Sequence, residues 1–360
     1  MSCTTAANLT RNRDKLKRLF NEPGGSDCHA IWMTHPGPVR PEYGDYTIAE
    51  EKDFQSWVDF VVKDYESQVR WHNRMGDDSV PYVRLVMGTH VFASAFGCHA
   101  EHFAESNPAS TPLVHGAEEA EKLKVPGLEH PIFERIFKMV EEVRRRVGPQ
   151  VPISVPDIQS PFDIAAMIWA KEDLFMGMYD TPEAVKDLVE KCHDLVVKFL
   201  DVYLTQVGEV NMAHCPVIWA PRELGIWLSE DEAGALSPDA FEEFCLPWLE
   251  RLSKRFGGIS MHCCAAADHQ YESFKKIPQL RGLNRVYQGP GPNPAIDAFA
   301  GQTTLIHAWS DENFVNQMID YAKAKADAGG PVCRFFFQMD PCSEEEARQL
   351  LDRLRRRLAR

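Results

Sequence analysis

The segment 258–265, Gly-Ile-Ser-Met-His-Cys-Cys-Ala, concentrates the side chains best suited to chemistry. Its composition is typical of a buried β-strand, in which residues two positions apart share a face. His262 and Cys264 are therefore expected to point the same way, and Cys263 the opposite way. An imidazole and a thiolate side by side are two of the three protein ligands that a catalytic zinc ion needs. The alternative is that these cysteines are packed as small apolar side chains.

The order of the predicted elements indicates where this strand lies. Short apolar runs alternate with amphipathic helical segments, which is typical of a parallel sheet. Helix starts are marked by Thr181-Pro182, by Ser237-Pro238 and by the capping box of Ser343 and Glu346. The eight predicted strands cover residues 30–33, 82–87, 151–155, 210–214, 258–264, 283–287, 303–309 and 332–339.

Eight strands joined by helices predict an α/β fold of the closed (β/α)₈ TIM barrel type. An open doubly wound sheet is the alternative, but no glycine-rich phosphate-binding loop follows an early strand. We expect residues 1–29 to form an N-terminal helical extension. Residues 30–360 are expected to form a single barrel domain, with an irregular excursion at about 98–130.

A third metal ligand has to come from another part of the chain. Barrel active sites lie at the C-terminal ends of the strands. Cys333 begins the last predicted strand and so lies at the wrong end, whereas Cys342 follows that strand and lies at the correct end. His262, Cys264 and Cys342 are therefore the predicted zinc ligands.

Other polar and aromatic residues follow the predicted strands and are expected at the barrel mouth. His214 is a candidate acid/base residue, and Glu230 and Asp231 are candidates for catalysis or for contact with the metal. His307 and Trp309 are expected to share one face of their strand. For all of these residues a purely structural role is the alternative. The candidate substrate-binding residues are Trp32, His35, Asp157, Gln159, Trp219 and His307.

Charge and composition exclude several classes of partner. The 360 residues include 39 basic and 53 acidic side chains, a formal net charge of -14, so neither nucleic acid nor an anionic membrane is an expected partner. No signal peptide and no apolar stretch long enough to span a membrane is visible. With no export signal, the 10 cysteines are expected to be reduced thiols in a cytoplasmic protein.

Several segments, in their order along the chain, resemble the uroporphyrinogen decarboxylase superfamily over nearly the whole length. The family fold is a (β/α)₈ barrel, in agreement with the strand count. The segments that carry the resemblance are Trp32-Met33 with Pro41-Glu42-Tyr43, Ser160-Pro161-Phe162, residues 174–183, and Ser229-Glu230-Asp231 with Leu236-Ser237-Pro238.

One branch of that superfamily contains zinc-dependent methyltransferases that work with methyl-corrinoid proteins. It carries His-x-Cys on one strand and a distant Cys after the last strand, and His262, Cys264 and Cys342 match this pattern. The resemblance thus implies a Zn²⁺ ion that activates a thiol or a methyl-donor heteroatom. It also implies a corrinoid carried by a partner protein, with a small-molecule methyl donor or thiol acceptor. Ala265 stands where these methyltransferases usually have Gly, so the donor and acceptor stay open.

The other branch decarboxylates uroporphyrinogen or a similar carboxylated substrate without a cofactor. Its members have an Arg-rich first loop, an Asp after the second strand and a Gly-His-Gly motif near the end of the chain. Here the first loop has one arginine, Arg40, the segment Arg84–Gly88 has no Asp, and Asp340-Pro341-Cys342 replaces the glycine motif. Guanidinium groups are the natural partners of carboxylates. The sequence therefore favours a methyltransferase, and a decarboxylase is the alternative function.

Overall fold

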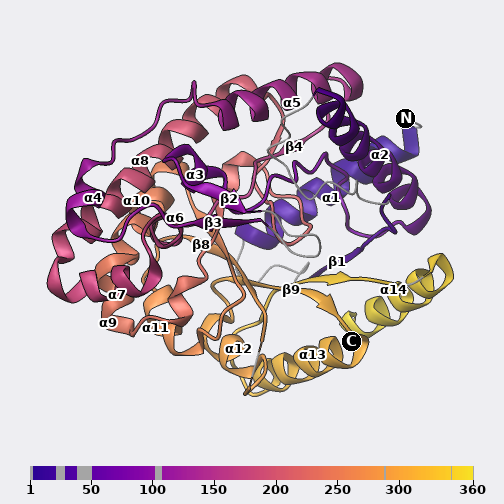
Figure 1. The fold of residues 1–360 in the computed structure, drawn as a ribbon. Coiled ribbons are helices and arrows are strands. Elements are labelled where there is room, and N and C mark those ends of the chain that lie inside the picture. Colours follow the sequence, from indigo (N-terminus) through magenta and orange to yellow (C-terminus); the bar gives the residue numbers. More distant parts are fainter. Residues whose placement is uncertain are drawn as a thin grey trace.

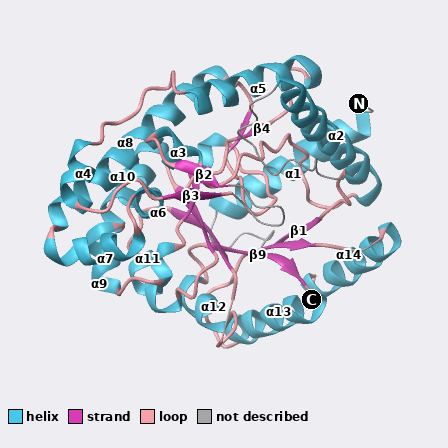
Figure 2. Cartoon of the chain, in the orientation of Figure 1, coloured by secondary structure: helices cyan, strands magenta, loops and turns pink. Residues whose placement is uncertain are grey.

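Parallel strands at the centre of the molecule are surrounded by helices (Figures 1 and 2). The structure is a computed structural model, and it describes residues 3–21, 29–38, 51–101, 108–287, 289–341 and 343–359. The strands are β1 (His29–Met33), β2 (His99–Glu101), β3 (Ala109–Thr111), β4 (Ile153–Ser154), β5 (Val210–Asn211), β6 (Ile226–Ser229), β7 (Ile259–Cys263), β8 (Leu280–Arg285), β9 (Thr304–Ser310) and β10 (Phe335–Met339). The α-helices are α1 (Cys3–Asn21), α2 (Glu51–Met75), α3 (Val91–Ala95), α4 (Ala117–Lys122), α5 (Pro131–Val147), α6 (Pro161–Ile168), α7 (Lys171–Asp180), α8 (Pro182–Gln206), α9 (Pro238–Phe244), α10 (Leu246–Phe256), α11 (Tyr271–Phe274), α12 (Asn293–Phe299), α13 (Glu312–Asp327) and α14 (Glu344–Leu358).

The strands form an α/β barrel, as predicted. Six of them make one parallel sheet in the order β1-β10-β9-β8-β7-β6, and β4 pairs with β5 in parallel. Two isolated parallel bridges continue the ring, Val83 with Ile153 and Gln159 with Ser229. The C-terminal ends of β6, β7 and β8 consequently lie side by side, with His262 in register between Ser229 and Asn284.

Two carboxylates close the ring between β1 and the segment that leads to Val83. The amide of Ile31 donates a hydrogen bond of 2.9 Å to Asp78, and the amide of Met33 donates one of 2.8 Å to Asp77. The amide of Asp78 in turn donates to the Ile31 carbonyl at 3.0 Å. Side-chain acceptors thus satisfy strand amides that a regular ladder would otherwise pair.

Several predicted strands are shorter in the structure than expected or have different bounds. Residues 82–87 contribute only the bridge at Val83, and the segment predicted at 210–214 is a strand only over β5. Beyond β5 the chain turns through a cis Cys215-Pro216 bond and comes back antiparallel, with the Met212 amide donating to the Ala220 carbonyl at 2.7 Å. The strand β6, which follows this return, was not predicted because its apolar run is only three residues long.

The N-terminal helix lies beneath the N-terminal ends of the strands. Near its end, the Leu19 carbonyl accepts hydrogen bonds from Thr304 Oγ1 at 2.7 Å and from Arg334 at 2.6 Å. Ser237 and Ser343 cap α9 and α14 as predicted, whereas the Thr181 side chain makes no capping bond to α8. The helix α1 thus covers one end of the barrel and leaves the opposite end for a site.

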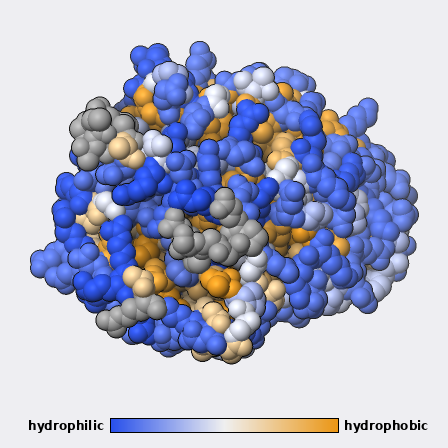
Figure 3. All heavy atoms as spheres, turned by 180° about the vertical axis from the view of Figure 1, so that it is seen from behind, coloured by the Kyte–Doolittle hydropathy of each residue, from blue (hydrophilic) through white to orange (hydrophobic). Residues whose placement is uncertain are grey.

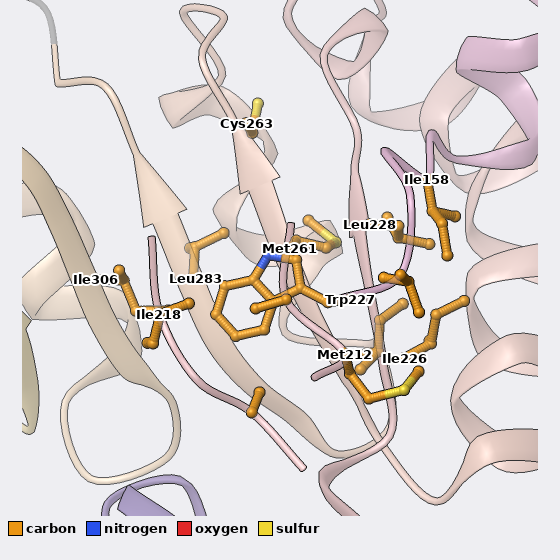
Figure 4. Packing of buried hydrophobic residues seen from close by; sticks show 14 of the residues in the cluster. Ile158, Met212, Ile218, Ile226, Trp227, Leu228, Met261, Cys263, Leu283 and Ile306 are labelled. Atoms are coloured by element: carbon orange, nitrogen blue, oxygen red, sulfur yellow. The ribbon is translucent and has the colours of Figure 1, made fainter. Parts of the chain in front are cut away.

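A dense apolar cluster packs around the barrel strands below that opposite end. Met212, Ile218, Trp227, Met261 and Leu283 come from separate segments and are all buried (Figure 4). On the outside, the face shown in Figure 3 is mostly hydrophilic, with apolar side chains visible between the polar ones. Within the described residues, no helix has the length and apolar character required to cross a membrane.

Candidate metal centre

Strand β7 places the predicted pair His262 and Cys264 at the carboxyl end of the barrel. Nitrogen, sulfur and oxygen donors of His262, Cys264 and Asp231 lie within 4.8 Å of one another. Cys263, between them, is fully buried, and burial raises the pKa of its thiol. The structure therefore brings together two of the predicted ligands and the predicted Asp231. Cys342 is outside the described residues.

Asp231 is held by contacts on both sides. Its carboxylate accepts a hydrogen bond of 2.7 Å from the backbone N–H of Cys264, which follows β7. The backbone amides of Asp231 and Glu232 donate to the Asp163 carboxylate at 2.7 and 3.0 Å. Asp163 belongs to the first turn of α6, where Ser160 caps its amide at 3.0 Å. A chain of hydrogen bonds thus links α6 to the loop after β6 and to the end of β7.

Glu230 is not among the grouped donors, and its catalytic role stays a prediction. It is fully buried, and among the described residues its carboxyl oxygens accept no hydrogen bond of ordinary geometry. Burial, first of all, raises its pKa to about 8, and burial and the charge of Glu230 raise the pKa of Asp163. Since Asp163 accepts two backbone N–H groups and Glu230 accepts none, Glu230 carries the proton of this pair at neutral pH.

The imidazole of His262 is oriented by Asn284 of β8. Its Nδ1 lies 2.5 Å from Asn284 Oδ1, and the amide nitrogen of Asn284 donates to the Ile306 carbonyl at 2.9 Å. Because this second bond fixes the amide, Asn284 presents an acceptor, and His262 Nδ1 carries the hydrogen. When the ring is neutral, the Nε2 lone pair is then the one available to a metal ion.

The ring of His262 also lies close to the thiols of Cys215 and Cys264. Burial alone would lower its pKa, but hydrogen bonds with the thiols of Cys215 and Cys264 and the charge of Asp231 raise it to about 11. Cys215 Sγ lies 3.9 Å from His262 Nδ1. An imidazole, thiols and a carboxylate within reach of one another form the donor set that zinc prefers, so these residues fit the ion implied by the sequence.

A cavity of about 320 Å³ opens beside these donors. Four predicted site residues line it: Asp157, His214, His262 and Cys264. Trp309, which was predicted at the barrel mouth, also lines it, whereas the polar lining residues Arg84 and Cys215 were not predicted. The position of Cys215 directly after His214 was the one available signal, whereas no local pattern marked Arg84.

Asp157 and His214 lie within hydrogen-bonding distance of each other in the cavity. His214 Nε2 lies 3.1 Å from Asp157 and 3.3 Å from the Ser229 hydroxyl. Gln159 donates to Asp157 at 2.6 Å, so this predicted substrate-binding residue supports the pair. Burial raises the pKa of Asp157, but the charges of His214, Arg84 and His262 outweigh burial and lower it. The pair is thus a hydrogen-bonded carboxylate–imidazole couple facing the space beside the metal donors.

Besides Gln159, four predicted substrate-binding residues do not line the cavity. Trp32 is buried edge-on to Tyr82, and Trp219 is buried beneath the guanidinium of Arg13. His35 pairs with Asp64 at 3.0 Å. The aromatic rings are core because the barrel interior needs large apolar side chains to fill it.

His307 packs against Phe314, with ring centroids 4.6 Å apart, and burial lowers its pKa to about 4. Trp309 is 56% exposed and lines the cavity instead. Its backbone has φ of 54°, a left-handed conformation that breaks the alternation of an extended strand. The prediction that the two residues share a face is therefore wrong.

Comparisons with known proteins agree with this architecture. A solved methyltransferase from Methanosarcina mazei superposes with a TM-score of 0.64 and 14% sequence identity, covering 97% of this chain and 99% of that one. No curated protein matches the chain significantly. The sequence profile of uroporphyrinogen decarboxylase (URO-D) matches residues 63–284, more than half of the chain. The chain therefore belongs to the uroporphyrinogen decarboxylase family.

Proposed function

We propose that the chain is a zinc-dependent methyltransferase that works with a methyl-corrinoid protein. The observation that carries the proposal is the convergence of Asp231, His262 and Cys264, with ligand atoms within 4.8 Å of one another at the end of the barrel. Cys342 is proposed as a further ligand from the sequence pattern. The likeness to a methyltransferase over nearly the full length of both chains supports the reaction class.

Bound zinc would supply a Lewis acid that favours the thiolate form of a substrate thiol or polarises the heteroatom of a methyl donor. The chain's own residues prepare the site for this chemistry. Asn284 sets the tautomer of His262, and Asp163 sets the position of Asp231. Both contacts reduce the rearrangement needed when a ligand enters.

His214 is proposed to move the proton of the reacting thiol or donor. It lines the cavity beside Cys264, and its Nε2 is paired with Asp157 at 3.1 Å. The Asp157 carboxylate holds the His214 ring in place beside Cys264, so that the ring can take up the proton that the reacting group gives up. Asp157 is thereby a positioning residue for His214.

Decarboxylation of a porphyrinogen is less compatible with the cavity. Its volume of about 320 Å³ is at the lower end of the range for small-molecule sites. Among the described residues that line it, Arg84 is the one guanidinium. A polycarboxylated tetrapyrrole would need more space and more cationic partners.

The decisive experiment measures zinc in purified protein by elemental analysis, together with an X-ray absorption spectrum at the zinc edge. We expect one zinc per chain with sulfur and nitrogen neighbours, lost in His262→Ala and Cys264→Ala. The matched control is Cys263→Ala, which removes the neighbouring thiol on the opposite face and is expected to keep the zinc. Zinc-free protein that decarboxylates uroporphyrinogen would overturn the proposal in favour of the alternative.

The corrinoid part of the proposal has its own test. Methylcobalamin or a methylated corrinoid protein is incubated with zinc-loaded enzyme and a thiol, and loss of the methyl–cobalt absorption is followed. His214→Ala is expected to slow this reaction by about 100-fold or more, a typical contribution of general acid–base catalysis, without a change in zinc content. An equal rate in the variant would remove His214 from the mechanism.

A further inference from the structure

Another cavity, of about 250 Å³, lies at the N-terminal end of the barrel, between α1, α2 and the segments that lead into Val83 and into β4. The labels α1, α2 and β4 mark this region in Figure 1. None of the described residues that line it also lines the cavity beside His262. Since barrel active sites lie at the opposite ends of the strands, this space is separate from the candidate metal centre.

Apolar side chains form much of the wall of this cavity. They come from both helices and from the two barrel segments, and they include Leu9, Val69, Val80 and Pro152. A few polar groups lie among them. This combination is the usual composition of a small-molecule site, and the volume is smaller than the roughly 300 to 1,000 Å³ of sites for drug-sized ligands. The size of the cavity therefore favours a ligand with a single ring.

The buried ring of His72 offers a hydrogen-bond acceptor to this cavity. The residue is only 3% exposed, and its Nδ1 lies 3.0 Å from the Ser79 hydroxyl, which donates its own hydrogen to Asp77 at 2.5 Å. Because that hydrogen is already used, Ser79 accepts from His72, and Nδ1 carries the ring hydrogen. Among the described residues Nε2 makes no hydrogen bond. Since the Nδ1 edge faces Ser79, the edge with the unused Nε2 lone pair lines the cavity.

Tyr65 and Arg13 add hydrogen-bond donors to the same wall. Burial raises the pKa of the Tyr65 hydroxyl, which stays protonated at neutral pH and makes no hydrogen bond within the described part of the chain. The guanidinium of Arg13 lies over the Trp219 ring, 5.4 Å from its centroid, and its Nη1 is 3.5 Å from Glu209. The side chains of this ion pair are 34% and 38% exposed, so the pair contributes little energy and leaves other donors of Arg13 to a ligand.

We propose that this cavity binds a small aromatic acid, a single ring that carries a carboxylate at one edge and a hydroxyl or N–H donor at another. The carboxylate accepts charge-assisted hydrogen bonds from Arg13 and a further one from Tyr65. The ring packs on the apolar wall, and its donor binds Nε2 of His72. All three side chains line one space of about 250 Å³, so a single small molecule can contact them together. The inference does not rest on the proposed function, because no metal donor takes part in it.

An occupant of this cavity would join parts of the chain that are distant in sequence. Arg13 belongs to α1, whereas Tyr65 and His72 belong to α2, and Val80 lies in the segment that runs on to Arg84 beside the metal donors. A ligand that binds only when these parts are packed together stabilises the folded state by mass action. Ligand binding is therefore expected to raise the temperature of thermal unfolding as the ligand concentration rises.

The test compares three matched ligands by isothermal titration calorimetry on the intact protein. These are 4-hydroxybenzoate, benzoate, which lacks the donor, and 4-hydroxybenzyl alcohol, which lacks the anion. We expect 4-hydroxybenzoate to bind about 10- to 100-fold more tightly than the alcohol and about 2- to 10-fold more tightly than benzoate, the usual values for a charged and a neutral hydrogen bond. Failure of all three to bind at millimolar concentration, or equal affinity for the acid and the alcohol, would overturn the inference.

Variants assign the binding to this cavity. Arg13→Gln is expected to weaken 4-hydroxybenzoate by about 10- to 100-fold and to leave the affinity for the alcohol unchanged. Tyr65→Phe removes a single oxygen and is expected to weaken the acid by about 2- to 10-fold, which keeps the test available if Arg13→Gln is unstable. Arg70→Gln, which removes an exposed guanidinium of α2, is the control for net charge and should change nothing. Unchanged affinity in both Arg13→Gln and Tyr65→Phe would contradict the proposed site.

A last comparison separates this site from the cavity at the other end of the barrel. Arg84→Gln and Cys264→Ala alter only that other cavity and are expected to leave the affinity for 4-hydroxybenzoate unchanged. If the affinity depends on Arg84 or Cys264 and not on Arg13, the acid binds beside the metal donors and the inference is wrong. Protein that binds the acid through Arg13 but never binds zinc would remove the proposed function and leave this site in place.

Discussion

The carboxylate of Asp231 accepts a hydrogen bond of 2.7 Å from the backbone amide of Cys264. The contact joins the loop after β6 to the end of β7 and brings a candidate oxygen ligand next to a candidate sulfur ligand. It connects residues 33 positions apart in sequence. The position of the metal donors thus depends on the loop after β6 as much as on the His-x-Cys strand.

Removing the support of that loop should weaken metal binding. In Asp163→Ala, the amides of Asp231 and Glu232 lose their acceptor at 2.7 and 3.0 Å, and Asp231 loses its fixed position. We expect zinc affinity to fall by about 10- to 100-fold, as for other residues that orient metal ligands. Competition with a chromophoric chelator measures the change. Asp173→Ala, on the exposed side of α7, is the control, and an equal effect there would contradict the prediction.

The contact between Asn284 and His262 leads to a second prediction. Asn284→Ala removes the acceptor 2.5 Å from His262 Nδ1 and frees the ring to rotate and change tautomer. Zinc affinity is expected to fall by about 10- to 100-fold. Asn284→Asp keeps an acceptor at this position and is expected to retain most of the affinity. The same chelator assay applies, and unchanged affinity in Asn284→Ala would show that the contact does not orient the ring.

The lowered pKa of His307 predicts that the folded protein loses stability in mild acid. Burial lowers its pKa to about 4 from the ordinary value of about 6.5, so the unfolded chain binds more protons between these two values. Stability is then lost as the pH falls from about 7 toward 4, by about 2 kcal/mol at pH 5 from this group. Urea unfolding of wild type and His307→Phe at pH 7 and pH 5 measures the difference. A pH dependence that is identical in the two proteins would be inconsistent with this account.

The raised pKa of Glu230 predicts that the protein loses stability as the pH rises, the reverse of the effect of His307. Its pKa is raised to about 8, chiefly by burial, so the folded protein keeps a proton that the unfolded chain releases above about 4.5. Stability from this group is fully present below about pH 4.5 and declines between about pH 4.5 and 8, at up to about 1.4 kcal/mol per pH unit, so that the loss is complete above about pH 8. Glu230→Gln keeps the shape and the uncharged state. Its unfolding free energy should exceed that of wild type at pH 9, as followed by urea titration.

Local patterns in the sequence were enough to predict part of the site. The alternation of a strand placed His262 and Cys264 on one side and Cys263 on the other, because side-chain direction in a regular strand depends only on position along it. Ser237 and Ser343 were predicted as helix caps for a similar reason, since each acts on an amide three residues away. The alternation failed at Trp309, where φ is 54°.

The tertiary structure decided which distant side chains complete the site. Arg84, Asp157, Cys215 and His262 come from four separate segments and meet because parallel strands bring their carboxyl ends to one rim. It also decided that Trp32 and Trp219 are core residues and that Glu230 is buried beside Asp163. Sequence periodicity describes one element at a time. The neighbours of a side chain across the barrel depend on strand register and closure, which arise only when all the elements pack together.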